Sequence, residues 1–329
     1  MTFARISGTG SYVPEKIITN DELSLMLGED INEFVSQVLG INERHICAEN
    51  QSTADLATEA AQNALRSAGI AAGELDLIIL ATDTPEYVSP ATSVVVQHRI
   101  GARNAGTFDI NCACAGFVTA LDTAAKYIIA DSSYKNVLVI GAYAMSKYLD
   151  WSEKKTATIF ADGAGAVILT ASELVPGFLG SKLVAEGSFH DHMGIYAGGT
   201  RMPITNEILD EGVWAKLRFA KKYPAEVNNE GWPAIVRDVL SKCALSVEDV
   251  GLFLFTQVNL ITIREVMSRL EMPMERTHTI MGKWGYTGSA CIPMALDDAV
   301  REGKLKGGDI VVMCASGGGL NMACAAFRW

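Results

Sequence analysis

Cys114 is the residue of this chain whose type and position most directly suggest chemistry. It lies in residues 107–121, between a short apolar segment typical of a strand and a helix predicted to begin at about Ala115. Backbone N–H groups and the dipole at a helix start favour a thiolate over a thiol. A thiolate at a strand-to-helix turn is a nucleophile suited to acyl transfer. A buried and inert cysteine is the alternative interpretation of the same pattern.

The composition indicates a soluble protein with a large core, since 49% of the 329 residues are hydrophobic and 20% are charged. The seven cysteines form neither a CxxC pair nor a cluster with histidine, which favours a reducing compartment and excludes a disulfide framework or structural zinc site. The first residues read as a strand rather than a signal peptide, and no apolar run is as long as a membrane span. We therefore expect a cytoplasmic protein that binds neither metal nor membrane.

The net charge of −11 argues against a nucleic-acid partner, which normally requires a basic surface. One local basic cluster interrupts this acidic background and consists of Lys216, Arg218, Lys221 and Lys222. Such a cluster is either a solvated face or a docking site for an anionic partner. A phosphopantetheine carrier or the phosphates of coenzyme A would be partners of that kind.

The chain repeats itself at an offset of 175 residues, because the apolar pair at 79–80 recurs at 254–255 and the strand-like triplet at 137–139 recurs at 312–314. Ala-Leu-Asp at 120–122 recurs at 295–297 with the same offset. Predicted helices over 54–68 and 232–243 precede predicted strands over 75–80 and 250–255. We infer two related halves, 1–170 and 171–329, that form mixed α/β layers with a site between them.

Over nearly its whole length the chain resembles the thiolase superfamily, and within it the β-ketoacyl-acyl-carrier-protein synthase III branch. The segments that carry the resemblance are residues 8–14, 40–45, 113–117, 160–166 and the glycine triplet 317–319. Ala-Cys-Ala-Gly-Phe at 113–117 is the most specific of them, and Asp-Gly-Ala-Gly-Ala at 162–166 supports it. The resemblance implies an α/β fold, a thiolase-like five-layered α-β-α-β-α sandwich built from two duplicated halves, and a homodimer.

The resemblance also implies roles for individual residues. Cys114 would take an acyl group from acyl-CoA or acyl-carrier protein, and the backbone N–H groups of Cys114 and Gly318 would hold the oxyanion. Phe34 stands where the family packs a tryptophan against adenine, and Gln257 and Asn259 would contact substrate. No cofactor is implied, because coenzyme A or phosphopantetheine thioesters are substrates.

The chain departs from the family at the two residues that complete the catalytic triad. Thr256 stands at the histidine position and Tyr286 at the asparagine position, while Ile261 replaces an arginine that contacts coenzyme A. A hydroxyl and a phenol each donate a hydrogen bond, but neither carries the positive charge of an imidazolium. We therefore expect acylation of Cys114 to persist and malonyl decarboxylation to be impaired.

Two places in the sequence offer replacement groups. Asp83 follows a predicted core strand, at the position of the catalytic glutamate of the related hydroxymethylglutaryl-CoA synthases, and would act as a general base or only shape a turn. His190 and His192 flank Asp191, an arrangement suited to a base or to a polar surface loop. Tyr286 itself would donate to a developing oxyanion or serve as a packed aromatic.

The sequence thus predicts an acyltransferase that loads Cys114 and passes the acyl group to an acceptor carbon, oxygen or nitrogen. Two alternatives remain open. One is a carbon–carbon condensing 3-oxoacyl synthase that uses Thr256, Tyr286 or Asp83 as substitute groups. The other is a non-catalytic partner subunit of a condensing enzyme, although such a subunit has no physical need for an activated thiol.

Overall fold

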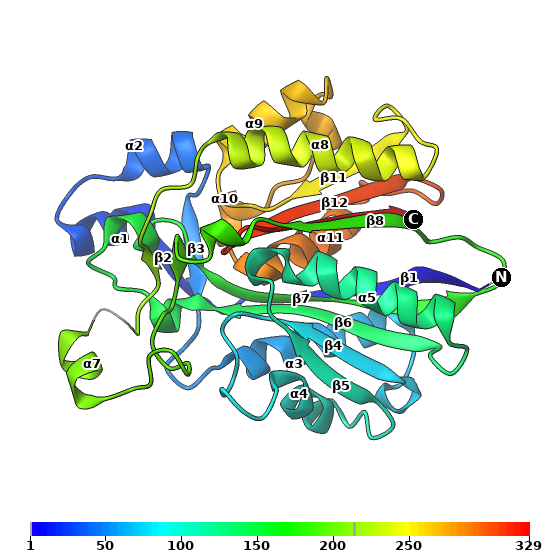
Figure 1. Ribbon diagram of the computed structural model, residues 1–329, viewed down its shortest axis with the longest axis horizontal. Coiled ribbons are helices and arrows are strands. Elements are labelled where there is room, and N and C mark those ends of the chain that lie inside the picture. Colours follow the sequence, from blue (N-terminus) through cyan, green and yellow to red (C-terminus); the bar gives the residue numbers. More distant parts are fainter. Residues whose placement is uncertain (1, 213–214) are drawn as a thin grey trace.

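The computed structural model describes residues 2–212 and 215–329 and contains two mixed β-sheets, with helices between them and on both outer faces (Figure 1). The first sheet has the strand order β1-β7-β6-β4-β5, and the second has the order β11-β12-β13-β8. The strands of the first sheet are β1 (Phe3–Tyr12), β4 (Leu77–Ala81), β5 (Gly106–Ile110), β6 (Asn136–Ala144) and β7 (Asp162–Ser172). Those of the second are β8 (Phe178–Ala185), β11 (Val250–Phe255), β12 (Ile310–Gly317) and β13 (Asn321–Arg328).

The long helices form three layers around these sheets, which completes the predicted five-layered arrangement. Two of them lie between the sheets and contact both, namely α5 (Gly116–Ala130) and α11 (Cys291–Arg301). The first sheet is covered outside by α3 (Thr53–Ala68) and α4 (Thr92–Ile100), and the second by α8 (Glu226–Lys242) and α9 (Leu260–Arg269).

Shorter elements complete the chain, several of them in the lobe at the left of Figure 1. The short strands of the chain are β2 (Lys16–Thr19), β3 (Glu43–Ile46), β9 (Met193–Gly194) and β10 (Arg218–Phe219). The short helices are α1 (Asn20–Leu27), α2 (Asn32–Phe34), α6 (Lys154–Ala157), α7 (Asn206–Glu211) and α10 (Met281–Trp284). A π-helical turn, η1 (Val35–Leu39), follows α2, and the 3₁₀ turns are η2 (Ala72–Glu74), η3 (Ala113–Ala115), η4 (Met145–Tyr148), η5 (Gly187–Phe189), η6 (Met274–Arg276) and η7 (Gly288–Ala290).

The second sheet repeats the topology of the first. Read as β8-β13-β12-β11, it matches β1-β7-β6-β4, and β5 is an additional edge strand of the first sheet. The helix predicted over 54–68 is α3, and the strand predicted over 250–255 is β11, with the same bounds. The helix predicted from residue 232 begins six residues earlier, at Glu226, because the polar first turns of α8 lack the apolar periodicity that marks a helix in sequence.

Burial explains why the inner elements have the sequences they have. All five residues of β4 are buried, as expected for a parallel strand covered by helices on both faces. The stretch Ala113–Ala130, which contains α5, is long and apolar enough to cross a membrane, and it is the one such candidate among the described residues. Most of it is buried inside the protein, since a helix packed between two sheets has apolar residues on more than one side.

The Asp-Gly-Ala-Gly-Ala segment has a structural role at the start of β7. A Cβ atom on Gly165 would lie 2.6 Å from the backbone nitrogen of Met294, so only glycine allows α11 to pack this closely on the sheet. The buried carboxylate of Asp162 accepts hydrogen bonds from the backbone N–H groups of Cys47 (2.7 Å) and Ser146 (2.8 Å). These contacts hold neighbouring segments in place beside the site.

Candidate active site

The turn that carries Cys114 lies between β5 and α5, as the sequence predicted. Ala113 adopts a φ of 46°, a left-handed conformation that is rare for a residue with a side chain and that often marks a functional turn. Cys114 is 3% exposed. A Cβ atom on Gly317 would collide with the carbonyl oxygen of Cys112 and lie 2.8 Å from the backbone nitrogen of Cys114. The glycine turn after β12 therefore packs directly against the backbone of the cysteine turn.

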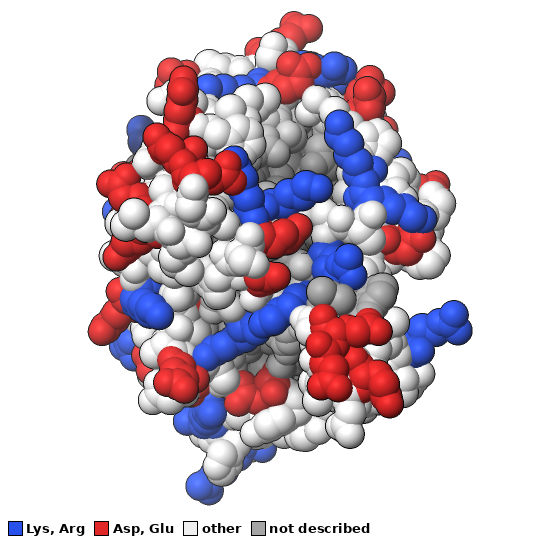
Figure 2. Space-filling view, turned by 90° about the vertical axis from the view of Figure 1, so that its left-hand side faces the viewer, with Lys and Arg blue, Asp and Glu red and all other residues white. Residues whose placement is uncertain are grey.

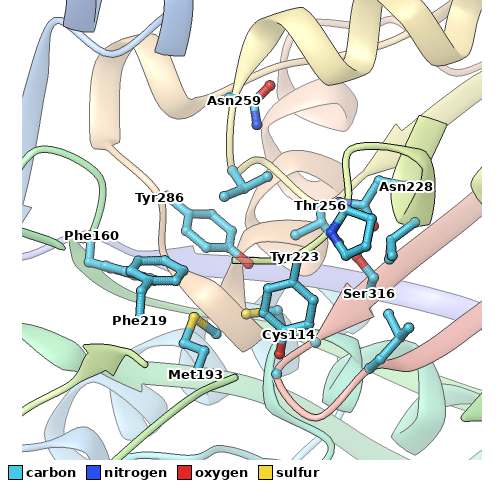
Figure 3. A pocket seen from close by; sticks show the side chains of 16 residues that line it. Cys114, Phe160, Met193, Phe219, Tyr223, Asn228, Thr256, Asn259, Tyr286 and Ser316 are labelled. Carbon is cyan, nitrogen blue, oxygen red and sulfur yellow. The ribbon is translucent and has the colours of Figure 1, made fainter. Parts of the chain in front are cut away.

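A cavity of about 210 Å³ gives access to Cys114 (Figure 3). Its lining combines apolar and aromatic side chains with a few neutral polar groups. The lining residues are Cys114, Phe160, Met193, Phe219, Tyr223, Pro224, Val227, Asn228, Thr256, Val258, Asn259, Tyr286, Ser316, Gly317, Gly318 and Leu320. Within residues 2–212 and 215–329, no side chain that lines this cavity carries a formal charge or an imidazole. Such a site can bind a neutral arm but lacks a strong base.

Figure 3 shows the phenol of Tyr286 pointing at the thiol of Cys114, so that its hydroxyl is placed to donate a hydrogen bond to the sulfur. The donated bond lowers the pKa of Cys114, but burial and the nearby charge of Asp83 raise that pKa well above its usual value. Burial likewise raises the pKa of Tyr286, so the phenol stays protonated. The sequence predicted a thiol made acidic by the helix start. In the structure burial outweighs that effect.

Thr256 lies at the end of β11, is 2% exposed and lines the cavity. Its hydroxyl oxygen accepts a hydrogen bond of 3.0 Å from the backbone N–H of Ser316, the residue before the glycine triplet. The Ser316 hydroxyl is bonded in turn to Asn228 of α8, with Oγ and Oδ1 2.8 Å apart. Thr256 therefore supports the glycine turn and still has its own proton to donate.

The other residues assigned by resemblance lie in different surroundings. Gly318 and Asn259 line the cavity, and the Asn259 side chain caps α9 by accepting from the Thr262 N–H at 2.7 Å. Gln257 is fully buried, and its amide is bonded to the carbonyl oxygens of Phe255 and His278 and to the N–H of Ile280. Alternate residues of an extended segment point to opposite sides, so Gln257 faces away from the cavity while Thr256 faces it.

Asp83 lies two residues after the end of β4 and does not line the cavity. Its Oδ1 atom is shielded from solvent and has no hydrogen-bond partner among the described residues. Burial raises the pKa of this carboxyl to about 6. Its charge in turn raises the pKa of both Cys114 and Tyr143, so the carboxyl lies within electrostatic range of the thiol.

The histidines around Asp191 lie behind the wall of the cavity rather than in it. The ring of His192 packs against Tyr223, with centroids 5.2 Å apart, and Nδ1 lies 3.1 Å from Asp191 Oδ1. Lys221 forms an ion pair with the same carboxylate. The hydroxyl of Tyr223, which does line the cavity, accepts from the Gly319 N–H at 3.2 Å. His192 thus supports a lining residue and is not positioned as a base for Cys114.

Several residues at positions assigned to contact with coenzyme A or a carrier protein are accessible at the surface. Phe34, on α2, is 47% exposed, and Ile261, on the first turn of α9, is 49% exposed. Lys221 and Lys222 are exposed near the rim residues Phe219 and Tyr223. At the end of the molecule that carries α1, α2 and α7, basic and acidic side chains are intermixed (Figure 2), so that face is not uniformly basic.

One group of side chains has the geometry of a metal site, although none was expected from the sequence. His278, Asp298 and Glu302 offer ligand atoms within 4.8 Å of one another. Lys283 donates to both Asp298 oxygens at 2.7 Å, and Lys304 lies 2.6 Å from His278 Nδ1. Two ammonium groups therefore already engage the atoms that a metal would need, and we read the group as an ion-pair network.

Several lining residues escaped prediction from the sequence. Phe160 is the first residue of one segment that the resemblance had singled out and Ser316 immediately precedes another, so their proximity to the site was readable. Met193, Tyr223 and Asn228 come from the irregular connection between β8 and α8 or from the first turn of that helix. No spacing or composition signal marks them, because only the folded connection brings them to the cavity.

Known proteins match the chain along its whole length. Residues 108–187 match the family described as 3-oxoacyl-(acyl-carrier-protein) synthase III, and residues 240–329 match its C-terminal counterpart. Beta-ketoacyl-(acyl-carrier-protein) synthase III of Caldanaerobacter subterraneus is 37% identical over 99% of this chain and 98% of its own length. The corresponding protein of Syntrophomonas wolfei is 38% identical over 99% of this chain and 97% of its own.

Solved structures give the same result. The crystal structure of 3-oxoacyl-(acyl-carrier-protein) synthase III from Aquifex aeolicus superimposes with a TM-score of 0.90 and 36% identity, covering 99% of this chain and 100% of that one. The priming β-ketosynthase of the R1128 polyketide pathway superimposes with a TM-score of 0.91 and 29% identity, covering 99% of this chain and 96% of that one. With its thiolase-like sandwich and a cysteine turn packed on a terminal glycine turn, the chain belongs to the 3-oxoacyl-(acyl-carrier-protein) synthase III family.

Proposed function

We propose that the protein is an acyltransferase that takes an acyl group from a coenzyme A or carrier-protein thioester onto Cys114 and passes it to an acceptor. The observation that carries this proposal is a cysteine thiol at an uncharged cavity, where the hydroxyl of Tyr286 faces it. An apolar cavity with a few neutral polar groups suits a pantetheine arm. The activity named for the relatives is transfer chemistry of the same kind.

The proposed first step is attack of the Cys114 sulfur on the thioester carbonyl. The new S–C bond forms while the donor's C–S bond breaks, and the thiol proton leaves with the donor's thiolate. The N–H groups of Cys114 and Gly318 are the candidate donors to the oxyanion, and the phenol of Tyr286 adds a third. In the second step the acceptor attacks the acyl-cysteine, its proton passes to the sulfur, and the free thiol is restored.

We further propose that this chain lacks the histidine and asparagine with which its relatives' family promotes decarboxylative condensation. Condensation of that kind requires hydrogen-bond donors that stabilise the enolate formed as carbon dioxide leaves the malonyl thioester. Thr256 and Tyr286, which we assign to those positions by resemblance, line the cavity, and no imidazole lines it among the described residues. A neutral hydroxyl stabilises a developing anion less than a charged donor does. Decarboxylation should therefore be slow relative to acylation.

Partner contacts are part of the same proposal. Lys216, Arg218, Lys221 and Lys222 flank the rim residue Phe219 in the sequence and would receive the phosphates of coenzyme A or the acidic surface of a carrier protein. Phe34 would stack on adenine, and Asn259 would contact the pantetheine arm. A homodimer is supported by β5, an edge strand that is not fully buried, and by exposed Tyr87 and Val88 nearby.

The test is to incubate the purified protein with acyl-CoAs of different chain length and with malonyl-CoA and to weigh the intact protein by mass spectrometry. Wild type and Cys112→Ala should gain the mass of the acyl group, whereas Cys114→Ala should not. Cys112 lies two residues from the proposed nucleophile and is a matched control. Carrier-protein thioesters extend the panel to the second donor class.

Two outcomes would contradict the proposal. The absence of an adduct from every coenzyme A and carrier donor would overturn the acyl-enzyme mechanism and favour a non-catalytic subunit. Rapid carbon dioxide release from malonyl-CoA, coupled to carbon–carbon bond formation, would overturn the impaired-condensation part and favour a condensing enzyme that uses substitute groups.

A further inference from the structure

Three residues from neighbouring parallel strands meet at one edge of the first sheet. In register, Ala81 of β4 pairs with Ile110 of β5 and with Gly141 of β6. Asp83 lies two residues after Ala81, and Tyr143 lies two residues after Gly141 on β6. Cys114 lies in the turn that follows β5. Because the carboxyl ends of parallel strands lie at the same edge, Asp83 and Tyr143 lie beside the cysteine turn.

The cavity approaches the thiol from a different direction. Its wall comes mainly from the second half and from the segment around β9 and β10, and it includes neither Asp83 nor Tyr143. A donor whose pantetheine arm lies in the cavity places its carbonyl carbon at the sulfur of Cys114. The acyl chain cannot occupy the same space as the arm during transfer, so it would have to extend past the sulfur, and the ends of β4 and β6 lie beyond it.

Asp83 has an unused hydrogen-bond acceptor at that edge. Its Oδ1 atom is buried and has no partner among the described residues. A buried carboxylate oxygen without a donor is costly, and in most proteins such an atom is satisfied by protein, water or ligand. The charge of Asp83 raises the pKa values of Tyr143, Tyr148 and Cys114, so these three groups lie within electrostatic range of the carboxyl.

We propose that Asp83 selects the acyl group, by accepting a hydrogen bond from a hydroxyl or ammonium group carried on the acyl chain close to the thioester. This inference rests on the proposed acyl-enzyme function and narrows its substrate class to acyl groups with a polar hydrogen-bond donor. A site that holds a buried acceptor for such a donor rejects the analogue that lacks it, because the acceptor then stays unpaired.

The test compares acyl-CoAs in matched pairs that differ only in the donor. 3-Hydroxybutyryl-CoA is set against butyryl-CoA, and β-alanyl-CoA against propionyl-CoA, with the rate of acylation of Cys114 read by intact mass. We expect wild type to favour the donor-bearing member of at least one pair by about tenfold or more. In Asp83→Ala, the two acyl-CoAs of each pair should acylate Cys114 at nearly equal rates, so the ratio of the rates should be close to one. Asp83→Asn keeps an acceptor oxygen without charge, so it should retain preference for the hydroxyl and lose preference for the ammonium.

The ratio of the two acylation rates within a pair distinguishes selection of the acyl group by Asp83 from general-base catalysis by Asp83. A general base would change both rates of a pair together and leave their ratio intact. Equal rates within both pairs for wild type, or unchanged ratios in Asp83→Ala, would overturn the inference while leaving the acyl-enzyme mechanism standing. No acylation of wild type by any donor would overturn the proposed function and this inference with it. Thermal unfolding of each variant verifies that the protein compared is folded.

Discussion

The hydroxyl of Tyr286 points at the thiol of Cys114 although the two residues come from different halves of the chain (Figure 3). Cys114 is carried by the turn between β5 and α5, whereas Tyr286 lies between α10 and η7. Tyr286 is held in place by its backbone, whose N–H donates to Ile159 at 3.1 Å and whose carbonyl accepts from Ala161 at 2.9 Å. The phenol therefore comes to the sulfur from a fixed position.

Replacing Tyr286 with phenylalanine should slow the reaction of Cys114. The variant keeps the ring and its packing on Phe160 but removes the hydrogen bond that favours the thiolate. A hydrogen bond to a charged group contributes about 1.5–3 kcal/mol, so we expect acylation and iodoacetamide alkylation to slow by about 10- to 100-fold. Because the pKa of Cys114 lies well above its usual value, alkylation measured from pH 7 to pH 10 should be slower in the variant at every pH. Tyr143→Phe is the control, and equal rates in Tyr286→Phe and wild type would contradict the assigned role.

Replacing Asp83 with asparagine should make the protein more stable at neutral pH. The folded-state pKa of Asp83 is raised from 3.8 to about 6 by burial, so ionisation of this carboxyl opposes folding. A raised pKa stabilises the fold below pH 3.8, and that contribution is lost as pH rises through about 6. The free energy of unfolding of Asp83→Asn should therefore exceed that of wild type at pH 7.5. The difference should vanish at pH 4, and a difference independent of pH would contradict this account.

Thr256→Val should lower stability, while Thr256→Ser should preserve it. Valine has the same shape as threonine but leaves the backbone N–H of Ser316 without the acceptor it has at 3.0 Å. Loss of one such hydrogen bond costs about 1 kcal/mol, to be measured by urea unfolding. Serine retains the oxygen and serves as the matched control. If both variants unfold like wild type, the hydroxyl does not hold the glycine turn.

Alanine at Gly317 should damage both the fold and the acylation of Cys114. The added Cβ would collide with the carbonyl oxygen of Cys112, a backbone atom that cannot move without displacing the cysteine turn. Overpacking of this kind costs about 1–3 kcal/mol, and acylation should fall with it. At Gly318 the nearest atom is the flexible end of Met193 at 3.1 Å, so Gly318→Ala should fold normally. Wild-type stability in Gly317→Ala would show that the two turns are not in tight contact.

The sequence alone was sufficient for the elements of this fold. The 175-residue offset and the apolar strands predicted α3, β4 and β11 close to their observed bounds, because local periodicity reflects which face of an element is buried. The cysteine turn was also readable, since a strand, a short turn and a helix follow one another within a few residues. The resemblance likewise pointed to Gly318, Thr256 and Tyr286, all of which line one cavity.

The chemical state and the surroundings of those residues depended on the tertiary structure. The thiol of Cys114 was predicted to be acidic, but packing between the two halves buries it and raises its pKa, because desolvation depends on neighbours far away in the chain. Gln257 faces away from the cavity and His192 lies behind its wall, while Tyr223 and Asn228 line it. Sequence thus determined which elements form and where the nucleophile sits. Only their long-range packing decided which side chains meet at the sulfur and how strongly water is excluded there.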